Sequence, residues 1–184
     1  MLLFVVHPVA FSNPFLRTSK PSHIVAVIPA RYESSRLPGK PLADIAGKPM
    51  IEHVYRRVAE ARGVDAVVVA TDDGRIATAV EDFGGVVRMT QLDHRTGTDR
   101  IAEVVRDLRC EIVVNVQGDL PLIEPGMIVD VVQPLEADDR VQMSTLRSEI
   151  KDWSDYDNPN VVKVVVDRND DALYFSRSPI PYLR

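Results

Sequence analysis

The 184-residue sequence contains one cysteine, Cys110, which excludes an internal disulfide framework and a zinc site built from cysteines. It has no basic surplus, because 22 lysines and arginines stand against 27 acidic residues, for a net charge of −5. This disfavours a general nucleic-acid binder but leaves room for a local cationic pocket. No apolar run approaches the ~18 residues of a membrane span. A reducing, cytoplasmic location agrees with these absences.

Several functional motifs are also missing. There is no HExxH and no evident Ser-His-Asp order, so a nucleophilic hydrolase has no support. GxGxxG is absent, and GxxxxGK[ST] fails because Ser34 stands at its first glycine and Pro41 follows Lys40. Two of the four histidines are weaker candidates for a functional role. We expect His53 to pack on a helix. For His94 two interpretations stay open, a contact with phosphate and no functional role.

Residues 1–23 contain no acidic residue, and their apolar start is broken by His7 and Pro8. A signal peptide would need a positive start and a small-residue cleavage site, and neither is clear. We expect a poorly ordered extension or an upstream start codon, with a targeting segment as the alternative. Residues 24–184 are expected to form a single domain.

From Ile24 onward, apolar strands alternate with amphipathic helices. We expect strands at 24–28, 65–71, 86–90 and 111–117. Helices are expected at 50–61, 74–83, 98–108 (with Thr98 as its N-cap), and from near Pro125 to before Pro134. This alternation predicts a Rossmann-like α/β fold, whose mostly parallel sheet is covered by helices on both faces.

Beyond residue 140 the pattern changes to strand-like segments without helices between them. The turn RNDD, Arg168–Asp171, separates the last two of these segments, so we expect them to form a hairpin. A mixed sheet with an antiparallel appendage follows.

The segment IPARYESSRLPGKPL directly follows the first strand. It carries the cations Arg31, Arg36 and Lys40, and Gly39 allows close approach of the backbone to a ligand. Ligands of parallel sheets bind beyond the carboxyl ends of the strands. We therefore interpret the segment as an anion cradle, with a solvated loop as the alternative.

Three later loops are expected at the same edge. TDD (Thr71–Asp73) follows the second strand, HRTGTDR opens a helix whose amides favour anions, and VQGDLPLI delivers Gln117 and Asp119. An aspartate facing cations on a neighbouring loop is suited to hold Mg²⁺ against a triphosphate. The alternative for Asp119 is a helix or turn cap.

Together these segments resemble a known family. IPARYESSRLPGKPL, GKPMIEHV, VVVATDD, GTDRIAEV, VNVQGD, NPNVVKVV and YFSRSPIPY occur in this order, as in 3-deoxy-manno-octulosonate cytidylyltransferase, or CMP-Kdo synthetase. The resemblance runs from Ile24 to the end. It implies a nucleotide-diphospho-sugar transferase-like fold and a Mg²⁺-dependent homodimer, which converts CTP and Kdo to CMP-Kdo and pyrophosphate for lipopolysaccharide synthesis.

The resemblance also implies roles for particular residues. The implied catalytic residues are Arg31, Lys40 and Asp119, of which Asp119 would hold the metal. Gln117 and Arg177 would contact the sugar acid. The nucleotide would be bound by Ala30, Arg31, Arg36, Lys40, Thr71, Asp72, Thr96, Gly97 and Thr98.

The sequence departs from the family pattern at two positions. Leu120 replaces the acid of the usual QGDEP, and Thr96 stands where serine is more usual. Leu120 keeps a related sugar acid, 8-amino-Kdo or a sialic acid, as an alternative substrate. Family members also continue past Arg184 into a part with a second metal-binding aspartate. A shortened CTP-binding or dimer-forming homologue without full activity is therefore the other alternative, and we expect weak or absent turnover alongside measurable CTP binding.

Overall fold

The computed structural model describes residues 4–6, 24–33 and 37–182. The chain divides into two compact units, Leu2–Leu146 and Arg147–Arg184, where the sequence predicted one domain over 24–184. In the part of the chain that is described, no helix combines the length and the apolar character needed to cross a membrane.

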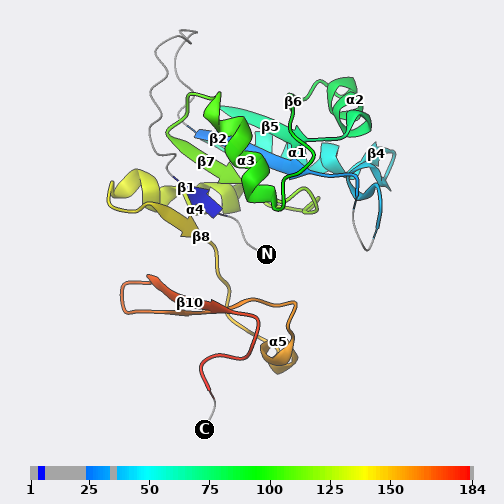
Figure 1. The fold of residues 1–184 in the computed structure, drawn as a ribbon. Helices are drawn as coiled ribbons and strands as arrows, with labels where there is room; N and C mark the ends of the chain where they lie inside the picture. The colour runs from blue at the N-terminus through cyan, green and yellow to red at the C-terminus, as the bar shows by residue number, and fades with distance from the viewer. Residues whose placement is uncertain (1–3, 7–23, 34–36, 183–184) are drawn as a thin grey trace. The chain divides into compact units, whose positions relative to one another are not determined.

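The larger unit is built on a six-stranded sheet of order β6-β5-β2-β7-β1-β8 (Figure 1). Its four parallel strands are β2 (Ile24–Ala30), β5 (Ala66–Thr71), β6 (Val87–Met89) and β7 (Ile112–Asn115). The predicted parallel sheet is confirmed, and β2 is central, between β5 and β7. The carboxyl ends of all four strands therefore lie at one edge.

Helices cover both faces of this sheet. The alternation of β2 explains why, because Ala26 and Ile28 face one apolar cluster while Val25 and Val27 face another. The second cluster is completed by α3 (Gly97–Arg106), and the first by α1 (Met50–Ala59), α2 (Gly74–Asp82) and α4 (Pro125–Ala137). After β2 come the 3₁₀ turn η1 (Lys40–Leu42) and a small hairpin of β3 (Asp44–Ile45) and β4 (Lys48–Pro49).

Two helix boundaries differ from the prediction. Thr96, not Thr98, is the N-cap of α3: its hydroxyl accepts the Asp99 amide at 3.1 Å, and its own amide donates to the Asp99 carboxylate at 3.0 Å. The helix α4 runs past Pro134, which the sequence placed beyond its end. Pro134 lies in the last turn, where one missing amide costs only one hydrogen bond and the helix ends soon after.

The start of the chain contributes a strand that the sequence did not predict. β1 (Phe4–Val6) is antiparallel to both β7 and β8 (Met143–Thr145), with Val5 opposite Val114 and Ser144. Three residues of the segment expected to be poorly ordered thus take an internal place in the sheet. The rest of residues 1–23 lie outside the described residues.

The smaller unit contains α5 (Trp153–Asp157) and the predicted hairpin, formed by antiparallel β9 (Lys163–Val166) and β10 (Ala172–Ser176). The carboxylate of Asp167 accepts the amides of Asn169 at 2.8 Å and Asp171 at 3.0 Å. These bonds fix the turn between the strands, which the sequence located at Arg168–Asp171.

A buried lysine lies within the smaller unit. Lys163 is 2% exposed, and its ammonium donates to the carbonyls of Asn158 at 2.9 Å, Val161 at 2.8 Å and Arg177 at 2.7 Å. All three ammonium protons therefore have an acceptor, which offsets the cost of removing the charge from water.

Candidate functional site at the carboxyl edge of the sheet

A cavity of about 980 Å³ opens at the carboxyl edge of the parallel strands. Its wall comes from the loops after β2, β5 and β6 together with the starts of α2 and α3. The lining residues are Arg31, Tyr32, Glu33, Pro38, Asp72, Asp73, Arg75, Leu92, His94 and Arg100. The volume is at the upper end of the range typical of small-molecule sites.

The loop after β2 is held in shape by Gly39 and Tyr32. Gly39 has φ of +71°, and a Cβ added there would lie 3.0 Å from the Tyr32 ring, so a side chain at this position would be both strained and crowded. The Gly39 amide also donates to the Tyr32 carbonyl at 2.8 Å. Arg31 lines the cavity, whereas Arg36, the third predicted cation, lies outside the described residues.

Lys40 and Asp119 come together from loops far apart in the sequence. The Lys40 ammonium donates to the Asp119 carboxylate at 2.7 Å, and both side chains are partly exposed. The Asp119 loop approaches the end of β2 closely, since a Cβ on Gly118 would lie 3.1 Å from the Pro29 carbonyl oxygen. This places the predicted acid against a predicted cation, although neither residue lines the cavity itself.

A cation–aromatic contact that the sequence did not predict lines the cavity. The guanidinium carbon of Arg75 lies 3.3 Å from the centre of the Tyr32 ring. Arg75 also donates twice to the Asp73 carboxylate, at 2.9 Å and 2.6 Å. The hydrogen bond from Arg75 holds the pKa of Asp73 below its usual value. Asp73 was visible within the TDD motif, but nothing in the pattern indicated its pairing with Arg75.

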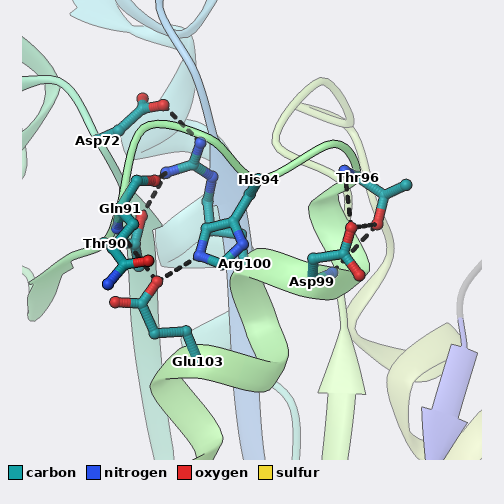
Figure 2. Close-up of polar contacts among 8 residues, drawn as sticks. All are labelled: Asp72, Thr90, Gln91, His94, Thr96, Asp99, Arg100 and Glu103. Carbon is teal, nitrogen blue, oxygen red and sulfur yellow. Dashed lines mark hydrogen bonds and ion pairs between the residues drawn. The ribbon is translucent and has the colours of Figure 1, made fainter.

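A second unpredicted arginine joins three segments at this edge (Figure 2). Arg100 is 3% exposed, and its Nη2 donates to the Asp72 carboxylate at 2.5 Å. Its Nη1 donates to the hydroxyl of Thr90 and, at 3.4 Å, to the carbonyl of Gln91. The ends of β5 and β6 are thereby fixed to the first turns of α3. The sequence contained Arg100 within the GTDR motif, but its partners became evident only in the fold.

His94 is held by the carboxylate of Glu103, which its ring contacts through Nε2 (Figure 2). This hydrogen bond lowers the pKa of Glu103, with help from the amide of Gln91. In the neighbouring capping box, the hydroxyl of Thr96 lowers the pKa of Asp99. His94 lines the cavity, so the contact with phosphate that the sequence left open stays geometrically available.

Several other predicted residues lie away from the cavity. Ala30 and Thr71 are buried at the paired ends of β2 and β5, and the Thr71 hydroxyl accepts the Asp73 amide at 3.2 Å. Thr96, Gly97 and Thr98 form the start of α3 but do not line the cavity. The nucleotide contacts predicted for these five residues therefore stay a prediction.

The predicted sugar-acid residues have local partners. Gln117 donates from its amide to the side-chain oxygen of Asn115 at 3.1 Å. Arg177 belongs to the smaller unit, where its guanidinium donates to the Pro159 carbonyl at 2.8 Å. Leu120, the residue that departs from the family pattern, packs against the apolar cluster that also contains Ile28. A glutamate at this position would lose that apolar contact.

Few of the described side chains are placed to bind a metal ion. Within the described ranges, no three histidine, cysteine or acidic side chains are grouped in a way that could hold a metal ion. Asp119 offers a partly exposed carboxylate beside Lys40 of the cationic loop. This fits Mg²⁺ in the way it accompanies nucleotides, held by one or two carboxylates together with phosphate oxygens and water.

These features define a class of protein. A parallel sheet whose carboxyl edge carries a cationic loop, an acidic loop and an open cavity is the arrangement of a nucleotide-binding α/β protein. The cytidylyltransferase family profile matches residues 25–184, and the chain belongs to this family.

Relatives and solved structures agree with this assignment. The 3-deoxy-manno-octulosonate cytidylyltransferase of Geobacter sulfurreducens is 60% identical over 162 residues, which cover 88% of this chain and 65% of that protein. The enzyme of the same name from Geobacter metallireducens is 60% identical over 161 residues, which cover 88% of this chain and 63% of that protein. The chain thus spans slightly less than two thirds of these relatives. A structure of CMP:2-keto-3-deoxy-manno-octonic acid synthetase complexed with CTP is 47% identical, with a TM-score of 0.80, and the match covers 88% of this chain and 67% of that one. A cytidylyltransferase from Leptospira borgpetersenii, 23% identical with a TM-score of 0.57 over 64% of this chain and 51% of that one, shares the fold.

Proposed function

We propose that this chain binds CTP with Mg²⁺ and serves the CMP-Kdo synthetase reaction, in which CTP and Kdo give CMP-Kdo and pyrophosphate. The observation that carries the proposal is the 2.7 Å pair of Lys40 and Asp119, which brings the cationic and acidic loops together at the edge of the sheet. The names of the relatives at 60% identity support the choice of nucleotide and sugar.

In the proposed reaction the anomeric hydroxyl oxygen of the sugar bonds to the α-phosphorus of CTP. The bond from that phosphorus to the bridging oxygen breaks, pyrophosphate leaves with its electron pair, and the proton of the attacking hydroxyl is released to solvent. Arg31, Arg36 and Lys40 would bind the triphosphate and offset the charge that moves onto the leaving group. Such phosphoryl transfer depends mainly on positioning and charge stabilisation, which these side chains can supply.

Asp119 is the proposed protein ligand of Mg²⁺. The ion, when bound, would neutralise charge on the phosphate oxygens. Lys40 already lies beside Asp119, so the same lysine can pass from the carboxylate to the phosphates as the nucleotide arrives. Gln117 and Arg177 are the proposed contacts for the sugar acid, because the planar fork of an arginine suits a carboxylate.

The proposal extends to assembly and location. A homodimer is supported by exposed apolar side chains in the smaller unit, at Trp153, Leu173, Tyr174 and Tyr182, and equilibrium sedimentation tests it. A cytoplasmic location is supported by Cys110, a single half-buried thiol, and by the intracellular supply of CTP, and cell fractionation tests it.

Asp119→Asn tests the metal role. The amide keeps the size of the side chain but removes its charge, so we expect CTP affinity measured with Mg²⁺ to fall about tenfold or more, or ~1.4 kcal/mol. Affinity measured without Mg²⁺ should change little. Titration calorimetry with CTP, with Mg²⁺ and with a chelator, measures both values.

Asp138→Asn is the matched control. Asp138 also pairs with a cation at 2.7 Å, its partner being Arg140, but it lies at the end of α4. Its substitution should leave CTP affinity unchanged under both conditions. Equal Mg²⁺-dependent affinity in Asp119→Asn and the unsubstituted chain would remove Asp119 from the metal role. Pyrophosphate release that requires both CTP and Kdo tests the whole reaction.

A further inference from the structure

We propose that Asp72, fixed by Arg100, selects cytosine over uracil by accepting a hydrogen bond from the 4-amino group of the base. The inference rests on the proposed function, because it assigns a specificity to the nucleotide site. Asp72 lines the cavity directly after β5, and its carboxylate is 2.5 Å from Arg100 through one oxygen, Oδ2.

The second oxygen of Asp72 has no partner among the described residues. Its side chain is 15% exposed, whereas that of Arg100, the partner of its Oδ2, is 4% exposed (Figure 2). The neighbouring Asp73 differs, because both of its oxygens are taken by Arg75. Asp72 therefore presents one acceptor to the cavity, and that acceptor needs a donor from the ligand.

The donors on CTP are few: the 4-amino group of the base and the ribose hydroxyls. Phosphate oxygens accept only, and they are expected at the cationic loop rather than against Asp72 and Asp73. A single free carboxylate oxygen matches a single amino group, and carboxylates accept from the 4-amino group of cytosine in nucleic-acid recognition. Uracil carries an oxygen at the same position, which would face the Asp72 oxygen as a second acceptor.

Arg100 strengthens the selection between cytosine and uracil, because its guanidinium donates hydrogen bonds and cannot accept them. In an Asp72→Asn variant the amide oxygen must turn toward Arg100, which leaves the amide NH₂ facing the cavity. The acceptor presented to the base then becomes a donor. We therefore expect the variant to lose about tenfold in affinity for CTP, and to gain affinity for UTP so that the preference is reversed.

The experiment is titration of the full chain with CTP and with UTP, in Mg²⁺, for the unsubstituted protein, Asp72→Asn and Asp73→Asn. Asp73→Asn is the matched control: it alters a carboxylate of the same cavity that has no free oxygen, so it should change both affinities by a similar factor. Circular dichroism and thermal melting establish that each variant is folded.

The inference can also be tested by changing the nucleotide rather than the protein. A CTP analogue with hydrogen in place of the 4-amino group should bind the unsubstituted chain about tenfold more weakly than CTP. Equal affinity for the analogue and CTP would overturn the inference, as would an Asp72→Asn variant that loses CTP and UTP affinity equally. The latter result would point to a ribose hydroxyl instead. Failure of the unsubstituted chain to bind CTP at all would overturn the proposed function as well.

Discussion

Cys110, which lies just before the amino end of β7, illustrates how burial controls the chemistry of a single side chain. Cys110 is the only thiol in the chain, and burial raises its pKa to about 11. Since the thiolate is the reactive form, a thiol that deprotonates at higher pH is protected from alkylation and oxidation near neutrality.

We predict that Cys110 reacts slowly in the folded protein. A pKa of about 11 in place of 9.0 implies about 100-fold less thiolate at pH 8, and the rate should rise about tenfold per pH unit until the pH approaches the raised pKa. Iodoacetamide labelling followed by mass spectrometry measures the rate, and the same chain in urea is the control. Equal rates in the folded and urea-treated protein would contradict the prediction.

At the residue scale, the sequence predicted which loops lie at the carboxyl edge of the sheet, but not which side chains contact one another there. Arg31, Lys40 and Asp119 were placed correctly at the carboxyl ends of strands, because the strand-end rule needs only the order of the elements. The contact between Arg75 and Tyr32 depends on how two loops pack, and local spacing does not encode it. Thr71 is the last residue of β5 and its side chain is fully buried, so its contact with a nucleotide stays a prediction.

Secondary-structure elements were predicted better than their caps. The buried strands and amphipathic helices were found because alternation and helical spacing are strong signals. The N-cap of α3 was assigned two residues late, since HRTGTDR contains a threonine at both position 96 and position 98. Only the reciprocal bonds between Thr96 and Asp99 decide between them.

We predict that Thr96→Ala lowers the free energy of unfolding by about 1 kcal/mol, because α3 loses its capping hydroxyl. Thr98→Ala is the matched control: Thr98 is exposed inside the first turn and its removal should cost far less. Urea unfolding followed by circular dichroism measures both. A larger loss at Thr98 would return the cap to the position predicted from sequence.

At the scale of the whole molecule, the start of the chain supplies a strand, β1, that lies inside the sheet. β1 pairs on both sides, with β7 and with β8, so its removal would expose two strand edges in the middle of the sheet. No local pattern could predict this, because the partners of Phe4–Val6 lie beyond residue 112 and the strand has only three residues.

We predict that deletion of residues 1–6 lowers the melting temperature by more than about 5 °C and increases self-association through the open edges. Differential scanning calorimetry and light scattering measure the two effects. An unchanged melting temperature would mean that β1 contributes little, as expected for the poorly ordered extension that the sequence suggested.

The two units also differ in what lies at their centres. The sheet unit surrounds apolar clusters, whereas Lys163 is the one buried residue among those described in the smaller unit. An ammonium ion bound by three backbone carbonyls there organises the surrounding loops much as a captured metal cation would. Cohesion of this kind is coordinative rather than hydrophobic. It should therefore persist on cooling, when apolar burial weakens, and yield to loss of the positive charge rather than to a change in side-chain volume.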